Sequence, residues 1–205
     1  MRIGIDFDNT IVSYDQLFHK VALEKGLVPE DLPANKSEVR NYLRKVGRED
    51  EWTRMQGYVY GGRMSEAAAY PGVKGFFQAC RGNSVELRII SHKTRQPYLG
   101  ESYDLHRAAQ TWLEEQGFFG AEIGLPREHV FFETTKQAKL ERIGQSQCEW
   151  FIDDLPEFLG EASFPAAVQR VLFDPANLYR DETRFRRIQS WKESQELFSL
   201  TRKAR

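Results

Sequence analysis

The chain has 205 residues, a formal net charge of -1, and 40% hydrophobic and 29% charged residues. This length suits one domain with room for a modest insertion, and the composition is that of an ordinary globular protein. The balanced charge gives no global field to recruit nucleic acid or an anionic membrane, and no apolar run is long enough to span a bilayer. Without a signal peptide or a disulfide framework, we expect a cytoplasmic protein in which Cys80 and Cys148 are reduced.

Short apolar segments rich in Val, Ile or Phe have the pattern of buried strands. They are residues 2–6, 85–91, 129–133, 149–154 and 169–174. Amphipathic segments with helical spacing lie between and after them, at 71–81, 103–116, 136–144 and 182–200. Strands that alternate with helices predict an α/β fold with a Rossmann-like, doubly wound parallel sheet.

The gap between the first two predicted strands is too long for a single crossover helix. It contains three helical segments, at 14–25, 36–46 and 50–60. An insertion directly after the first strand would lie near the carboxyl edge of the sheet, where α/β proteins bind ligands. We therefore predict a catalytic core of residues 1–13 and 71–205, and a small all-helical cap of residues 14–70.

Acidic pairs close two of the predicted strands. Asp6 and Asp8 follow the first strand, and Asp153 and Asp154 end the fourth. Because parallel strands end at one edge, these carboxylates are expected to converge, and their repulsion would raise their pKa values. A hard cation such as Mg²⁺, which prefers oxygen ligands, removes that penalty. Any single Asp here would serve equally well as a turn cap, but two pairs favour a metal site.

Two further residue types belong to the same pattern. Ser91 ends the second predicted strand and brings a hydroxyl to the same edge. Lys136 begins the helix that leads into the acidic fourth strand, and Lys139 competes with it from one turn further along.

In this order, the segment Asp6–Thr10 (DFDNT), Ser91, a helix lysine and the Asp153-Asp154 pair resemble the four motifs of the haloacid dehalogenase-like (HAD) hydrolase superfamily. The resemblance covers the whole chain and matches residues 14–70 to a helical cap. It implies a phosphatase that forms an aspartyl-phosphate intermediate. In that reaction Asp6 is the nucleophile and Asp8 is the general acid and base.

The resemblance implies further roles. Mg²⁺ is expected on the Asp6 carboxylate, the Asp8 backbone carbonyl and Asp154, with Asp153 acting through water or as a support. Ser91 and Lys136 are the expected donors to the phosphate oxygens. Lys136 is preferred over Lys139 because its spacing to Leu140 and Ile143 fits the family. Two residues are open: Thr10 either assists phosphate or caps the chain, and His92 is more often structural than in contact with substrate.

We expect the substrate to be a small phosphorylated metabolite, because a helical lid closes over small molecules and excludes water. A phosphotransferase or phosphomutase would use the same residues, and product analysis separates it from a phosphatase. A non-catalytic module with the same fold is the third alternative, which the full set of catalytic residue types disfavours. The sequence specifies neither the substrate, the oligomeric state nor the role of the polar loop 92–103.

Overall fold

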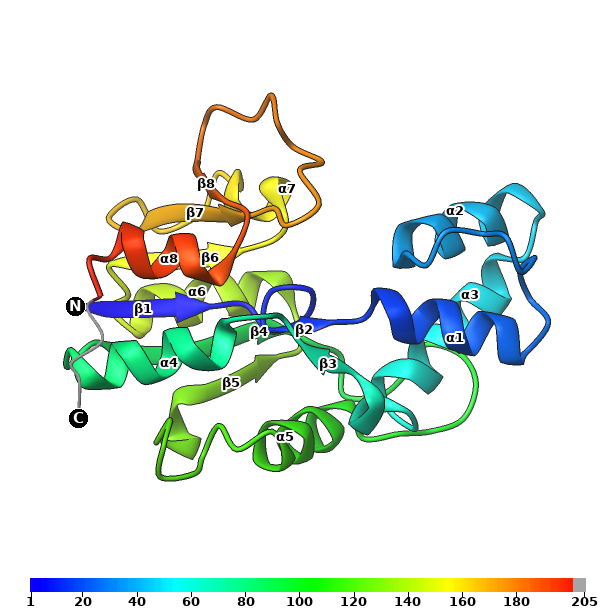
Figure 1. The fold of residues 1–205 in the computed structure, drawn as a ribbon, viewed down its shortest axis with the longest axis horizontal. Coiled ribbons are helices and arrows are strands. Elements are labelled where there is room, and N and C mark those ends of the chain that lie inside the picture. Colours follow the sequence, from blue (N-terminus) through cyan, green and yellow to red (C-terminus); the bar gives the residue numbers. More distant parts are fainter. Residues whose placement is uncertain (201–205) are drawn as a thin grey trace. The chain divides into compact units, whose positions relative to one another are not determined.

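The structure is a computed structural model that describes residues 1–200 and contains two compact units (Figure 1). Unit 1 comprises Met1–Val12, Ala69–His92 and the chain from Gly117 onward. Unit 2 comprises Ser13–Ala68 and Lys93–Gln116. The segment 93–116 therefore groups with the inserted helices, whereas we had predicted it to be part of the core. Residues 201–205 of the predicted core lie outside the described residues.

Unit 1 is built on a six-stranded sheet with the order β5-β4-β1-β6-β7-β8, in which every neighbouring pair is parallel. Its strands are β1 (Arg2–Ile5), β4 (Glu86–His92), β5 (Val130–Glu133), β6 (Trp150–Asp153), β7 (Gln169–Phe173) and β8 (Arg186–Ile188). The predicted parallel α/β sheet is confirmed. The long helix predicted over 182–200 is wrong, because this region forms β8 and then the short helix α8 (Trp191–Leu197), whose amino end is capped by Ser190.

Helices cover both faces of this sheet (Figure 1). On one face, α4 (Val73–Gly82) meets α8, where the rings of Phe76 and Trp191 lie 5.0 Å apart and Trp191 lies 5.3 Å from Phe173 of β7. On the other face, α6 (Lys136–Gln145) and α7 (Pro156–Leu159) bury a second cluster. That cluster includes Ile90, Leu140, Ile143, Phe151, Phe158 and Leu172. Alternate residues of each strand thus serve opposite faces, as a doubly wound sheet requires.

Unit 2 is mainly helical. It contains α1 (Asp15–Glu24), α2 (Lys36–Lys45), α3 (Glu49–Tyr60), the 3-10 helix η1 (Met64–Glu66) and α5 (Leu105–Glu115). Phe18 stacks at 4.9 Å on Trp52, and the buried Trp112 of α5 donates from Nε1 to the Ala67 carbonyl at 2.9 Å. This anchor explains why 93–116 belongs here. Two of the four places where the chain passes from one unit to the other lie in the short paired strands β2 (Val12–Ser13) and β3 (Ala68–Ala69).

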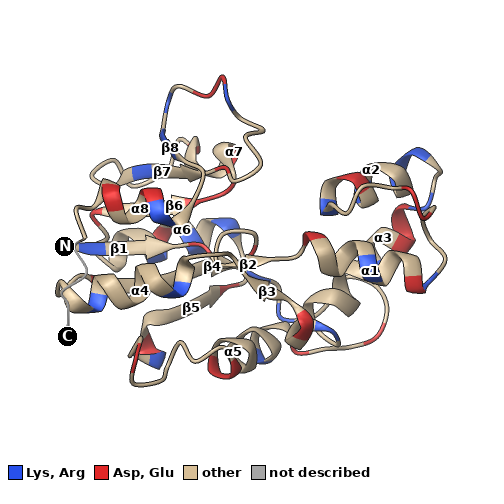
Figure 2. Cartoon of the chain, in the orientation of Figure 1, with Lys and Arg blue, Asp and Glu red and all other residues tan. Residues whose placement is uncertain are grey.

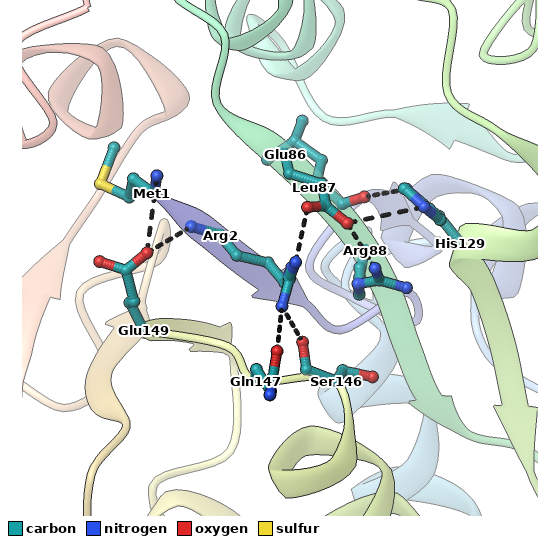
Figure 3. Close-up of polar contacts among 9 residues, drawn as sticks. All are labelled: Met1, Arg2, Glu86, Leu87, Arg88, His129, Ser146, Gln147 and Glu149. Atoms are coloured by element: carbon teal, nitrogen blue, oxygen red, sulfur yellow. Dashed lines mark hydrogen bonds and ion pairs between the residues drawn. The ribbon is translucent and has the colours of Figure 1, made fainter.

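Polar contacts of Arg2 tie the amino end of β1 to the start of β4 and to the segment before β6 (Figure 3). Its guanidinium donates to the Glu86 carboxylate at 2.8 Å and to the Ser146 carbonyl at 2.9 Å. His129, at the end of the 3-10 helix η2 (Arg127–His129), has Nδ1 3.1 Å from the Leu87 carbonyl oxygen and Nε2 3.6 Å from Glu86. These contacts secure the edge of the sheet opposite to the one where the acidic pairs lie.

Lys and Arg are interspersed with Asp and Glu in each unit (Figure 2). This mixture is consistent with the net charge of -1. Within residues 1–200, no helix combines the length and the apolar character that crossing a bilayer would need.

Gly4 in β1 leaves the space that a neighbouring aromatic ring fills. A Cβ atom at this position would lie 2.5 Å from Cδ2 of Phe151 and 3.0 Å from Sγ of Cys148. We expect Gly4→Ala to lower the free energy of unfolding by about 1–3 kcal/mol, because the core has no room for the methyl group. The matched control is Gly75→Ala in α4, where the nearest atom lies 3.6 Å away. There, greater helix propensity should stabilise by about 0.5–1 kcal/mol.

Urea unfolding of both variants checks this pair. Equal midpoints for Gly4→Ala and the parent protein would contradict the tight packing at β1.

Candidate active site

The two acidic pairs meet at the carboxyl edge of the sheet in unit 1. β1 and β6 are parallel neighbours in a register that pairs Ile5 with Ile152, and the Asp6 N–H donates to the Ile152 carbonyl at 2.9 Å. Asp6 and Asp153 therefore end adjacent strands, and both are buried. The convergence expected from the sequence is present.

A tight turn follows β1. Asn9 has a φ of 58°, a left-handed conformation that Asn adopts more readily than most residues. The Ile11 N–H donates to the Phe7 carbonyl at 3.0 Å and closes the turn. The sequence DFDNT thus reverses direction directly after Asp8, which leaves the Asp8 side chain half-buried at the end of the strand.

Lys139 is the cation that joins the two acidic strand ends. Its Nζ lies 2.6 Å from Oδ1 of Asp6 and 2.6 Å from Oδ2 of Asp153, and its side chain is only 4% exposed. Nζ also lies 3.9 Å from the ring centroid of Phe158, which adds a cation–π contact. Burial lowers the pKa of Lys139, but the charges of Asp153 and Asp6 raise it by more, so the ammonium stays protonated.

Lys136, which we predicted to face the acidic pairs, is paired with a different carboxylate. Thr135 caps the amino end of α6, so Lys136 is the first residue of the helix, and its side chain is 55% exposed. Its Nζ donates to Oε1 of Glu161 at 2.5 Å. Lys139 lies one turn later on the buried face of α6, which also carries Leu140 and Ile143. The phase of the helix therefore brings Lys139, and not Lys136, to Asp6.

A cavity of about 180 Å³ opens at this edge of unit 1. Six predicted site residues line it: Asp6, Asp8, Ser91, His92, Lys136 and Asp154. Ser91 is buried at the end of β4, next to β1, whereas His92 is exposed. Carboxylates, a hydroxyl group and an ammonium group thus share one small space.

Two predicted residues, Thr10 and Asp153, are not among those that line the cavity but support it. Thr10 is fully buried, and its Oγ1 donates to Oδ1 of Asp154 at 3.2 Å. Both oxygens of Asp153 accept hydrogen bonds, one from Lys139 at 2.6 Å and the other from the Leu155 N–H at 3.0 Å. These contacts fit a positioning role. For Asp153 this was one of the predicted alternatives, whereas for Thr10 we had predicted either assistance to phosphate or a cap of the chain.

The lining of the cavity includes residues that sequence reasoning did not single out for this site. They are Asn9, Leu155, Glu157, Phe158 and Glu161. Leu155, Glu157 and Phe158 belong to the turn and short helix α7 that follow Asp154, and Glu161 comes just after that helix. Pro156 at the first position of α7 is a signal in the sequence that this segment begins a helix at the active edge.

The oxygen donors at the cavity fit a divalent cation. Within residues 1–200, no three His, Cys, Asp or Glu side chains are grouped as a metal site. Mg²⁺ does not need such a group, because it uses one or two carboxylates together with water and phosphate oxygens. Burial raises the pKa of Asp6 to about 7; Lys139 opposes this shift, and the charges of Asp153 and Asp8 add to it. A cation bound beside Asp6 would favour the ionised carboxylate, as the excess of acids here requires.

No protein-family model matches the sequence, and no curated protein matches it either. Solved structures do match the fold. A HAD family hydrolase from Deinococcus radiodurans, with bound phosphate and sodium, shares 16% identity at a TM-score of 0.57, over 97% of this chain and 94% of that chain. A predicted phosphoglycolate phosphatase from Haemophilus somnus shares 15% identity at a TM-score of 0.56, over 96% of both chains.

A third match is a protein from Bacillus subtilis that is assigned to the HAD hydrolases and whose structure was solved with bound magnesium. It shares 13% identity at a TM-score of 0.52, over 96% of this chain and 97% of that chain. The chain has the HAD fold. Identities this low show the fold alone, and the HAD resemblance stated from the four motifs is confirmed at that level. Within this HAD fold, the order β4-β1-β6 places Ser91, Asp6 and Asp153 at the ends of three adjacent strands.

Proposed function

We propose that this chain is a Mg²⁺-dependent phosphatase that hydrolyses a small-molecule phosphomonoester through an aspartyl-phosphate at Asp6. One observation carries the proposal: a buried Asp6 carboxylate, held 2.6 Å from Lys139, lines a small cavity together with Asp8 and Ser91. The HAD-fold neighbours with bound phosphate or magnesium, and the one named as a predicted phosphoglycolate phosphatase, support the same chemistry.

In the first step, a carboxylate oxygen of Asp6 attacks phosphorus, and the bond from phosphorus to the ester oxygen breaks. Asp8 gives its proton to the departing oxygen, so the product leaves as a neutral alcohol. The Ser91 hydroxyl and the Lys139 ammonium donate to the phosphoryl oxygens as negative charge spreads over them. Lys139 also fixes the orientation of the Asp6 carboxylate.

In the second step, the Asp8 carboxylate takes a proton from water, and the water oxygen attacks phosphorus. The bond between phosphorus and Asp6 then breaks, which releases phosphate and restores both acids. Mg²⁺, held by the Asp6 and Asp154 carboxylates and the Asp8 backbone carbonyl, would supply positive charge to the phosphoryl oxygens. Thr10 and Asp153 keep Asp154 and Lys139 in place.

Removal of the metal tests this proposal. After treatment with EDTA and desalting, we expect release of phosphate from p-nitrophenyl phosphate to stop, and millimolar Mg²⁺ to restore it. Sodium chloride of equal ionic strength is the control and should not restore it. Circular dichroism of the metal-free protein should match that of the parent. Turnover that persists in the thoroughly metal-free protein would contradict the role of the ion.

The same assay, extended to phosphorylated sugars, nucleotides and cofactors, identifies the substrate class. Each reaction is analysed for free phosphate and for phosphorylated products. Release of one free phosphate per substrate consumed supports a phosphatase. Transfer of the phosphoryl group to an acceptor hydroxyl would instead indicate a phosphotransferase that uses the same Asp6 nucleophile.

A further inference from the structure

Both lysines that line the cavity are already paired with carboxylates. Lys139 bridges Asp6 and Asp153, at 2.6 Å from each. Lys136 donates to Glu161 at 2.5 Å. A second anionic group on a ligand would therefore have to compete with a protein carboxylate for either ammonium.

Acidic residues outnumber these lysines in the lining. Asp6, Asp8 and Asp154 have roles in the proposed reaction, but Glu157 and Glu161 have none. Phe158 and Leu159 of α7 are buried in the core cluster with Phe151, which anchors the helix that carries Glu157. Glu157 itself is exposed, whereas Glu161, which comes just after α7, is 30% exposed and is held by its ion pair with Lys136.

We propose that Glu157 and Glu161 form an acidic wall that selects phosphomonoesters whose remaining part is uncharged or cationic. This inference rests on the proposed function and concerns the same site. In the proposed reaction the phosphate group would contact Mg²⁺, Ser91 and Lys139. The remaining part of the substrate would lie beside Glu157 and Glu161. A substrate with a second anionic group, such as a carboxylate or a further phosphate, brings like charges together, which is an effective way to reject a ligand.

The Lys136–Glu161 ion pair makes this rejection stronger. Alone, Lys136 would attract a carboxylate on a substrate. Paired with Glu161, whose side chain is 30% exposed against 55% for Lys136, it offers no net charge to the cavity. Glu157 then leaves the wall negative. The HAD-fold neighbour from Haemophilus somnus is named for phosphoglycolate, a carboxylate-bearing ester, and this chain is expected to disfavour that compound.

Three two-carbon monoesters test the wall, because they share a skeleton and differ only in the terminal group. They are 2-aminoethyl phosphate, 2-hydroxyethyl phosphate and 2-phosphoglycolate. With Mg²⁺ present, we expect kcat/KM for phosphoglycolate to be at least about 10-fold below that for the hydroxyethyl ester, and the amino ester to match or exceed the hydroxyethyl ester. Added salt should narrow the difference, because it screens the repulsion.

The double variant Glu157→Gln with Glu161→Gln should remove most of the discrimination, since it neutralises the wall and leaves Lys136 without its carboxylate. The matched control is Glu128→Gln, an exposed residue of η2 that does not line the cavity, and it should keep the preference of the parent. Equal use of all three esters by the parent, or an unchanged preference in the double variant, would overturn the inference.

Direct binding separates this inference from the proposed function. Dissociation constants of the three esters are measured by calorimetry on the Asp6→Asn variant with Mg²⁺, which requires no turnover. Absence of phosphate release from every ester and from p-nitrophenyl phosphate would reject the phosphatase. The order of the three dissociation constants, and its change when the wall is neutralised, would still support or overturn the acidic wall.

Discussion

Asp6→Asn is expected to abolish phosphate release, with kcat lowered by about 10³-fold or more, because the amide lacks the nucleophilic oxygen that forms the covalent intermediate. The fold should persist. In the parent protein, Nζ of Lys139 lies 2.6 Å from Oδ1 of Asp6. An Asn side chain retains an oxygen that can accept this hydrogen bond, and Lys139 keeps its second partner, Asp153. Melting curves close to those of the parent, together with loss of turnover of p-nitrophenyl phosphate, check both parts.

Chemical trapping sharpens this test. Borohydride reduction of the parent during turnover, followed by peptide mass spectrometry, should find the modification at Asp6. Asp8→Asn is the companion variant: it keeps the nucleophile but loses the acid and base, so turnover should fall while the position of trapping stays at Asp6. Activity of Asp6→Asn equal to that of the parent, or trapping at another residue, would eliminate the covalent mechanism.

The sequence was enough to predict the sheet and the acidic edge. Strands β1 and β6 are short apolar segments, and aspartates stand at or directly after the carboxyl end of each. Their length and apolar composition predicted buried strands, and the aspartates predicted an acidic edge of the sheet. Parallel pairing then brings Asp6 and Asp153 together without any further information. Each aspartate can be recognised from its own segment of sequence, and pairing of the two strands brings the aspartates side by side.

The choice between Lys136 and Lys139 could not be made from spacing alone. Both lysines lie within four residues on one helix, and the outcome depends on where the helix begins and which side faces the sheet. Thr135 is a capping residue in the sequence, which places Lys136 in the exposed first turn. Lys139 is an unusual core residue, and its burial makes sense only once Asp6 and Asp153 are seen beside it.

Two other predictions failed because they concern tertiary packing. The apolar face of α5 is clear in the sequence, but its partner is not. Trp112 finds that partner in unit 2, at the Ala67 carbonyl. In the region 182–200, Ile188 and Trp191 are at helical spacing, yet Ile188 belongs to β8 and Trp191 begins α8. Here burial against Phe173 outweighed the local pattern.

Lys139→Met is expected to lower both activity and stability. It removes the cation that holds Asp6 and leaves two buried carboxylates without it, so the free energy of unfolding should fall by about 3–5 kcal/mol. Phosphate release should fall by about 10²-fold or more, because a donor to the phosphoryl group is lost together with the orientation of Asp6. Urea unfolding and steady-state kinetics measure the two effects.

Lys136→Met on the same helix is the matched control. The ion pair between Lys136 and Glu161 is largely exposed. Loss of this pair should therefore change the free energy of unfolding by less than about 1 kcal/mol, and kcat should stay close to that of the parent. If Lys139→Met fails to fold, combining it with Asp153→Asn removes one of the stranded carboxylates and should recover part of the stability, as residues in direct contact do in a double-mutant cycle. Severe loss of activity in Lys136→Met, with Lys139→Met near the parent, would restore Lys136 as the lysine that serves Asp6.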